Sequence, residues 1–493
     1  MLKIKEMLII YFILNILIFF NINAQDSPIL QILHSPYSYF TNPAITSECK
    51  VSLGGLLIPI SGQVMLPLYF EYNNNSFTYK DLIHKGQGIY SDSLIIDIEN
   101  FLKKFKKIGY VESNFFIPLL YIGLKINKDL FLAFGINEKA YFRISLPKDL
   151  LLLLWEGNGK SLLGKDAYLG HFGLTFNWHR EYYFGITKQI NNKTILGVRA
   201  NVLFGKINLF SRKNNISFYT HYDDYSLTLK TDVIYFMSQP FFKIEEFKFD
   251  NKNDSIIFET VKTFDFDKFS DYLKKLIFLK KNLGISFDVG TIIKKNEKYT
   301  FYISILNLGF INYKINPNGL NIKGNFIFDG WNIQPYLTKN DSLIKENEKK
   351  FKDSLINSIS INLSKKAYNY WLKPSFLLGT KFVINDKFDL NPILTTTFFL
   401  NKFHFSFSIG ANYKPFEWFT LTLAPTIKNN TIKNVGFGFN IKAKPLNLLM
   451  LSNNIFSFIW PQNTKTVNFF LGLIWTFSCK KVEHTKLFNT KFI

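Results

Sequence analysis

Uninterrupted apolar runs are what this sequence lacks once its first 24 residues are set aside. No later segment offers the run of about 18 to 20 apolar residues that a membrane-spanning helix requires. Hydrophobic residues nevertheless make up 47% of the chain and aromatic residues 17%. Apolar residues that are so abundant and yet so dispersed indicate an all-β protein, either a soluble one or a membrane β-barrel.

Catalytic and metal-binding signatures are also missing. The seven histidines include no His-x-x-x-His pair of the kind that binds zinc on a helix. No Gly-x-Ser-x-Gly nucleophile elbow occurs, and no complete Gly-x-x-x-x-Gly-Lys-Ser/Thr phosphate loop. The sequence therefore predicts a protein that is not an enzyme and that holds no cofactor or metal.

The first 24 residues have the features of a secretory signal peptide. Lys3 and Lys5 precede an apolar run over Met7–Phe20, and Ala24 supplies a small residue at a cleavage point. An uncleaved anchor is the alternative, but the run is shorter than the roughly 20 residues that span a bilayer. We expect cleavage after Ala24, secretion through the inner membrane and residence in the outer membrane of a Gram-negative envelope.

Several later segments alternate between apolar and polar residues almost without error. They include Tyr168–Trp178, Leu283–Thr291, Phe403–Lys414 and Asn434–Ala443. In Phe403–Lys414 the odd positions are apolar, whereas the even positions are His, Ser, Gly, Asn or Lys. Successive strand side chains point to opposite faces, so each segment predicts a strand with one apolar and one polar or small face.

The length of these segments favours a membrane barrel over a soluble sandwich. Strands of soluble proteins usually have about five or six residues, whereas a tilted strand needs about 9–11 to cross a bilayer. Aromatic residues near the segment ends fit an interfacial girdle. We therefore predict an all-β fold, a transmembrane antiparallel β-barrel of about 14 strands (12–18 are compatible), with short helices in its loops or lumen.

The predicted organisation has four parts. Residues 1–24 form the signal peptide and residues 25–48 a periplasmic or plug segment. Residues 49–479 form the barrel, and residues 480–493 a C-terminal tail.

Short asparagine-rich segments separate neighbouring strands. They are Asn127–Asp129, Asn191–Lys193, Asn385–Lys387 and Asn429–Asn430. Asn and Asp tolerate the backbone conformations that tight hairpins require. We expect these turns on the periplasmic side and longer connections outside.

One strand changes its phase at Gly205. Leu196, Val198 and Val202 share one face, but beyond Gly205 the apolar positions become Ile207 and Leu209. An extra residue at this point predicts a β-bulge.

Three segments interrupt the strand pattern with helical features: Leu94–Ile108, Pro147–Trp155 and Phe266–Lys281. A fourth, Lys339–Lys366, has the polar composition of an exposed loop. The helices could lie on a membrane surface, over the barrel mouth or inside the lumen. We expect a polar, narrow and occluded lumen, with Pro147–Trp155 as the candidate filling helix.

The polar faces of the strands supply the candidate lumen-facing residues. A hydrogen-bonded structural role is expected for the two histidines among them, rather than a catalytic one. The candidates are His171, Thr175, Arg199, Asn201, Asp288, His404, Ser406, Ser408, Asn412 and Asn440.

The formal net charge of +22 raises the question of an anionic partner. A nucleic acid is not expected, because the lysines are scattered and concentrate in turns and loops. Attraction to anionic lipid head groups and lipopolysaccharide is the expected consequence. Lys, Asn, Ile and Phe are all abundant, which also indicates compositional drift in an AT-rich genome.

The sequence also resembles a known family along essentially the whole mature chain. The family is a Bacteroidota-type outer-membrane family of unknown function, related to the fatty-acid channel (FadL-like) barrels. The resemblance implies a FadL-like barrel of about 14 strands and, by analogy, transport of hydrophobic molecules. The residues that carry it are Asn42–Ala44, Cys49–Val51, Pro147–Asn158, Asp288–Gly290, Leu306–Ile311 and Asn468–Cys479.

Three functions of different classes remain open. The first is a channel or transporter for small hydrophobic molecules. The second is a structural or assembly partner of an envelope secretion or gliding machine. The third, a barrel enzyme that acts on lipid or peptide, has the least support because no catalytic motif accompanies it.

The only two cysteines, Cys49 and Cys479, predict a disulfide. One lies at the start of the first strand and the other at the end of the last, and a closed barrel pairs these strands. An even number of strands also puts both ends at the same rim, within the 4.4–6.8 Å between Cα atoms that a disulfide needs. The periplasm is oxidising enough to form the bond. Two free thiols are the alternative.

Overall fold

A computed structural model gives the arrangement of the chain. It describes residues 35–55, 67–241, 244–250, 255–260, 281–330, 334–337, 341–399, 402–428 and 431–479. The predicted signal peptide and C-terminal tail, the expected helix over Phe266–Lys281 and the turn at Asn429–Asn430 lie outside these ranges.

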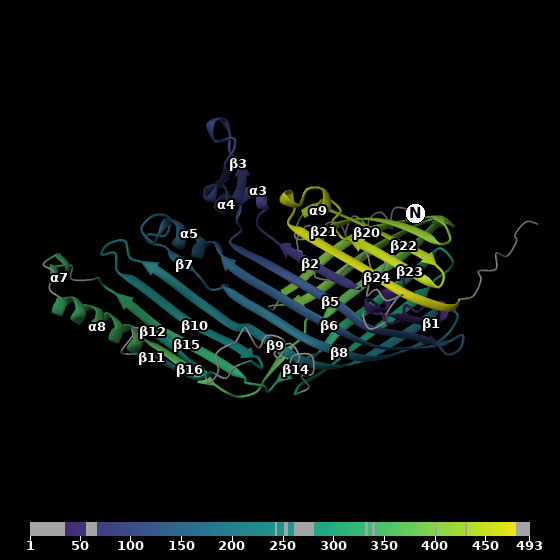
Figure 1. The fold of residues 1–493 in the computed structure, drawn as a ribbon, viewed down its shortest axis with the longest axis horizontal. Helices are drawn as coiled ribbons and strands as arrows, with labels where there is room; N and C mark the ends of the chain where they lie inside the picture. The colour runs from purple at the N-terminus through teal and green to yellow at the C-terminus, as the bar shows by residue number, and fades with distance from the viewer. Residues whose placement is uncertain are drawn as a thin grey trace, which may run out of the picture.

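Antiparallel strands close into a 14-stranded barrel, as predicted (Figure 1). β1 and β2 share one position between β24 and β5. The ring runs through β1 (Cys49–Gly54) with β2 (Leu68–Asn74), β5 (Ile108–Lys125), β6 (Leu130–Pro147), β8 (Gly173–Gln189), β9 (Thr194–Thr220), β13 (Asn282–Lys294), β14 (Tyr299–Tyr313), β18 (Ser375–Asn385), β19 (Phe388–Phe399), β20 (Lys402–Phe416), β21 (Phe419–Lys428), β22 (Thr431–Ala443), β23 (Leu446–Ser452) and β24 (Thr466–Cys479).

The outer face of this ring is apolar and its inner face is polar or small. Val198, Ile285 and Leu378 are 42%, 43% and 39% exposed on the outside. Their strand neighbours Arg199 and Ser286 are 2% and 0% exposed on the inside. This inversion of the usual soluble pattern is what a lipid-facing wall requires.

Aromatic pairs mark both edges of the apolar band on β19 and β20. Phe388 stacks on Tyr413 at one end, with ring centroids 4.7 Å apart, and Phe398 lies 5.0 Å from Phe403 at the other. Ten residues of strand at about 3.4 Å each, tilted by about 40°, give a height of about 25 Å. That is the height of the apolar band of outer-membrane barrels.

Tight turns gather at one edge of the barrel, which we call the short-turn rim. The side-chain oxygens of Asn127, Asn191 and Asn385 each accept two backbone N–H bonds within their turns. Asn296 does the same in a turn that the sequence analysis did not single out. β1 begins and β24 ends at this rim. The opposite edge, with the longer connections, is the long-loop rim.

Strand β9 has 27 residues and is much longer than the roughly 9–11 residues that a strand needs to cross a bilayer. Its first part pairs with β13 in the ring and its second part with β10 (Leu227–Ser238). β15 (Asn318–Phe328) and β16 (Ile359–Ser364) continue this branch, which carries α8 in Figure 1. The predicted bulge is confirmed: Lys206 is the extra residue, because Trp178 pairs with Ile207 while His179 pairs with Gly205.

Helices and small sheets occupy the long-loop side. Among them, the helix predicted over Pro147–Trp155 is confirmed as α5. They comprise α3 (Tyr79–Leu82), β3 (Ile83–Lys85), η2 (Gly88–Tyr90), β4 (Leu94–Ile96), α4 (Ile98–Lys104), α5 (Lys148–Glu156), β7 (Asp166–Tyr168), β11 (Ile244–Asp250), β12 (Ser255–Thr260), α7 (Gln334–Leu337), α8 (Asp341–Ser358), β17 (Tyr368–Trp371), α9 (Phe456–Ile459) and η4 (Pro461–Asn463). No helix in the described part of the chain is both long enough and apolar enough to span a membrane.

Three expectations about these segments were wrong. The segment Leu94–Ile108 becomes helical only from Ile98, since its first residues form β4 in a small sheet with β3. Lys339–Lys366 is not a loop: it holds α8 and β16, because Phe351 of α8 packs on Phe326 and Phe328. α5 does not fill the lumen but lies beyond the end of β6 (Figure 1).

Candidate functional site

The N-terminal segment, not α5, occupies the lumen. Residues 35–48 precede β1, and we call them the plug; η1 (Pro36–Phe40) forms their first half. Tyr37 and Tyr39 are 1% and 0% exposed, and both belong to one core cluster with residues of the wall. In Figure 1 this purple segment lies within the ring of strands.

Arg199 of β9 is the main polar attachment of the plug. Its side chain is 2% exposed, and its Nε donates to Asp288 of β13 at 2.8 Å. Its Nη1 donates to the backbone carbonyl of Tyr39 at 3.2 Å. The guanidinium also lies over the ring of Tyr39, 5.4 Å from its centroid, and over that of Phe40, at 5.9 Å. One cation therefore links two wall strands to the plug.

Asp288 is saturated by further donors. Asn201 donates to its Oδ2 at 2.8 Å, and the backbone N–H of Asn307 donates to its Oδ1 at 2.6 Å. Asn307 has φ of 61° and sits where the register of β13 and β14 shifts. The bulge thus aims a backbone donor at the buried carboxylate.

Glycines on the inner wall make room for the plug. A Cβ at Gly197 would collide with the carbonyl of Pro43, and one at Gly290 with the side chain of Asn42. Gly185 and Gly472 likewise face the rings of the plug tyrosines. These glycines lie on the polar or small strand faces that the alternation predicts. The absence of side chains at these inward positions was therefore the signal in the sequence that could have indicated a plug.

Hydrogen bonds hold the middle of the plug. Thr187 Oγ1 donates to the Pro43 carbonyl at 2.6 Å, and Ser304 Oγ donates to the Thr41 carbonyl at 2.7 Å. Asn42 Nδ2 donates to the carbonyl of Ile303 at 3.2 Å. Thus β8 and β14 both bind backbone or amide groups of the plug directly.

A cavity of about 230 Å³ lies in the lumen against the plug. Phe40 and Thr41 of the plug contribute to its lining, and Thr397 and Lys373 place it toward the long-loop rim. Aromatic and aliphatic side chains dominate the rest: Tyr69, Phe116, Tyr141, Leu306, Tyr370, Leu372, Leu377 and Phe470.

Charged groups at the cavity are already engaged. Lys139 pairs with Glu181 at 2.7 Å, and Asn137 donates to the same carboxylate at 2.8 Å. His179 Nδ1 lies 2.9 Å from the Asn177 amide oxygen. Most of the cavity surface is therefore apolar, with polar groups that are fixed by their neighbours.

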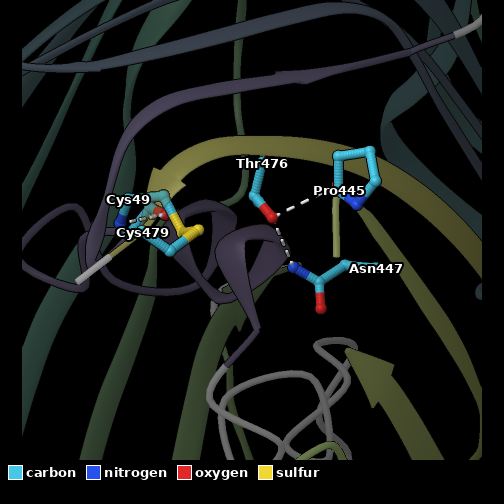
Figure 2. The surroundings of a disulfide bond; sticks show 6 residues. Cys49, Pro445, Asn447, Thr476 and Cys479 are labelled. Atoms are coloured by element: carbon cyan, nitrogen blue, oxygen red, sulfur yellow. Dashed lines mark hydrogen bonds between the residues drawn. A yellow bond between two sulfur atoms is a disulfide. The ribbon is translucent and has the colours of Figure 1, made fainter. Parts of the chain in front are cut away.

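The predicted disulfide is confirmed. Cys49 and Cys479 are bonded at a separation of 430 residues, and their Cα atoms lie 3.9 Å apart, closer than the expected range. They are direct partners in the β1–β24 register. Figure 2 shows the bond beside Thr476, whose hydroxyl donates to the Pro445 carbonyl at 3.3 Å. The bond ties the end of the plug to the barrel seam at the short-turn rim.

Most residues predicted to face the lumen are buried on the inner face. Arg199, Asn201 and Asp288 form the plug attachment described above. The others lie on the inner wall, apart from the plug attachment: Thr175, His404, Ser406, Ser408, Asn412 and Asn440 are all less than 9% exposed.

His171 is the exception, and its assignment to the lumen was wrong. It lies in an exposed turn with φ of 119°, between β7 and β8. The alternation over Tyr168–Trp178 spans this break, because Tyr168 pairs with β9 in β7 and the wall strand starts only at Gly173. His179, which sequence reasoning passed over, is the histidine at the cavity.

The described residues offer no group of three His, Cys, Asp or Glu side chains that could hold a metal ion. Several ionisable side chains of the lumen instead form ion pairs with one another, as Arg143 does with Glu112 at 3.2 Å. The arrangement can bind and hold a molecule, and its polar groups fix the plug.

One known family matches most of the chain. A model described as a family of unknown function, DUF5723, matches residues 55–453. The chain belongs to DUF5723. Curated proteins gave no significant match to this DUF5723 chain.

Several solved structures are similar to this DUF5723 protein over most of its length. A Pseudomonas aeruginosa FadL homologue is 10% identical, with a TM-score of 0.35 and coverage of 90% of this chain and 94% of that one. The P. putida toluene transporter TodX is 9% identical, with a TM-score of 0.37 and coverage of 90% and 94%. The translocator domain of the Neisseria meningitidis autotransporter NalP is 6% identical, with a TM-score of 0.30 and coverage of 89% and 93%. Scores this low carry no functional argument.

Proposed function

We propose that this protein is an outer-membrane channel for small hydrophobic molecules, with a lumen closed by its own N-terminal plug. The single observation that carries the proposal is the cavity of about 230 Å³, lined mainly by aromatic and aliphatic side chains and floored by the plug. Ligand sites are typically concave and mostly apolar, with a few fixed polar groups. The short-turn rim would face the periplasm and the long-loop rim the exterior.

Transport then requires the plug to move. Its end is fixed covalently through Cys49, whereas its first half is held by the Arg199 network. Displacement of the first half would open a path past Phe40 while the disulfide keeps the end of the plug in place.

A pair of leucines tests the proposal. Leu377 is 3% exposed and lines the cavity, whereas Leu378 is 39% exposed on the lipid-facing side. We expect barrels purified from membranes to carry small hydrophobic molecules that mass spectrometry detects. Leu377→Trp should abolish this retention, and Leu378→Trp should preserve it. Equal retention in all three proteins, or none in the wild type, would refute a luminal site.

A second candidate, partner of an envelope machine, is favoured by one separate observation. The β3–β4 hairpin on the long-loop side exposes Ile89, Leu94 and Ile96 by 91%, 72% and 64%. Clustered exposed apolar residues often mark protein contacts. If this role is correct, Ile89→Ser with Leu94→Ser should release specific co-purifying proteins and leave the retained small molecules unchanged.

A further inference from the structure

Three lysines occupy inward-facing strand positions near the short-turn rim. They are Lys381 of β18, Lys414 of β20 and Lys442 of β22. Each lysine lies an even number of residues from a buried, inward-facing residue of its own strand and therefore points to the same side. These buried residues are Leu377, Asn412 and Asn440. A molecule that leaves the lumen at this rim would pass close to these strand ends.

The one buried carboxylate among them is already satisfied. Asp389 is 2% exposed and accepts an ion pair from Lys414, with Lys381 at 3.8 Å. Asn391 and Asn412 donate to its other oxygen at 2.5 and 2.7 Å. Asp389 therefore positions two lysines but has little capacity left for a third.

Lys442 leaves a surplus of positive charge. Within the described part of the chain no carboxylate lies within ion-pair distance of it, although Glu48 at the end of the plug is in electrostatic range. Lys414 and Lys444 are in range as well, and they repel it. Like charges crowded at a partly enclosed mouth favour a bound anion, because the walls reduce screening by water.

The lysines are also accessible. The side chains of Lys381 and Lys414 are 22% and 32% exposed, and Lys442 is exposed. Charged ammonium groups that a ligand can reach bind carboxylates through short, charge-assisted hydrogen bonds.

We infer that Lys381, Lys414 and Lys442 form an anion-binding site at the periplasmic mouth of the lumen, which takes the carboxylate of a small organic acid. The inference rests on the proposed channel function, since it adds an anionic group to the hydrophobic molecule that passes. A molecule that crosses the lumen would occupy the apolar cavity on one side of the plug first and would reach the lysines on the other side afterwards.

Calorimetric titration of the purified full-length barrel tests the site with three probes: benzoate, the neutral benzyl alcohol and inorganic phosphate. The double variant Lys414→Gln, Lys442→Gln should weaken benzoate binding by about tenfold or more. Lys442→Arg should retain it. Lys387→Gln removes an exposed lysine from a turn of the same rim and serves as the matched control.

The inference is supported if benzoate binds more tightly than benzyl alcohol and only the double variant loses this difference. It is overturned if benzoate binding is unchanged in the double variant, or if phosphate binds as tightly as benzoate, which would indicate a site for any anion. Failure of the channel proposal looks different. Molecules would then be absent from the Leu377 cavity while benzoate binding still depended on the lysines.

Discussion

The plug meets two different kinds of wall. On the β8–β9–β13–β14 side it is held by glycine clearance, the Arg199–Asp288 pair and hydrogen bonds to its backbone. On the β18–β23 side it meets apolar side chains that belong to the same core cluster as its tyrosines. They are Leu377, Ile393, Ala424, Leu449 and Leu451.

The difference teaches which wall specifies the position of the plug. Hydrogen bonds and glycine notches fit only one placement of a backbone, whereas apolar packing tolerates small displacements. We therefore expect variants on the polar wall to open the lumen, and variants on the apolar wall to lower stability without opening it.

Arg199→Met should have the largest effect. It leaves Asp288 buried without its cation, and breaking a buried pair costs about 3–5 kcal/mol. Urea unfolding of the purified barrel in micelles should show this loss in the free energy of unfolding. Adding Asp288→Asn should recover part of it, because the uncompensated charge is gone.

Arg180→Met is the control for Arg199. Arg180 pairs with Glu138 at 2.5 Å on the outer face, away from the plug. If Arg180→Met raised ion conductance as much as Arg199→Met, the plug attachment assigned to Arg199 would be wrong.

Leu449→Ala should be next, on the apolar wall. Leu449 is 2% exposed, and truncation of a buried leucine costs about 2–3 kcal/mol at the lower end of the usual range. Unfolding should become easier while planar-bilayer recordings stay silent. A steady current from this variant would contradict the claim that only the polar wall fixes the position of the plug.

Gly197→Ala should destabilise by about 1–3 kcal/mol, as overpacking does, because the added methyl group meets the Pro43 carbonyl. Here the lumen should open even though the loss of stability is no larger than for Leu449→Ala. Val198→Leu, one residue away on the lipid-facing side, is the matched control. Silent recordings from Gly197→Ala would show that the notch does not fix the plug.

Thr187→Val should have the smallest effect, about 1 kcal/mol for one lost hydrogen bond to the Pro43 carbonyl. Brief openings in bilayer recordings are expected rather than a steady current. A variant with unchanged stability and no openings would remove Thr187 from the attachment.

Periodicity alone predicted much of the wall. Alternation over Phe403–Lys414 and Leu283–Thr291 corresponds to β20 and β13 because a lipid-facing strand has one strictly apolar face. Topology predicted the disulfide, because a closed ring with an even strand number brings both ends to one rim. His171 failed because alternation continues by chance across the turn that separates β7 from β8.

The sequence offered a plug as one of two possibilities for residues 25–48, but the placement of the plug and the branch of β9 could not be read from local pattern. Residues 35–48 have no periodicity of their own, and their placement depends on Gly197, Gly290 and Arg199, which lie about 150 residues or more away in sequence. Likewise, Phe351 of α8 packs on Phe326 and Phe328, a contact that the polar composition of this segment does not predict.

Ion conductance across a planar bilayer tests the central claim, that the N-terminal segment closes a membrane barrel. Wild-type protein would be compared with a variant that lacks residues 35–46 but keeps Cys49. A gel shift between unheated and heated samples would verify that both have folded. We expect the wild type to be silent and the deletion to carry a steady current. A large, steady current through the wild type, or a silent barrel after the deletion, would contradict the account.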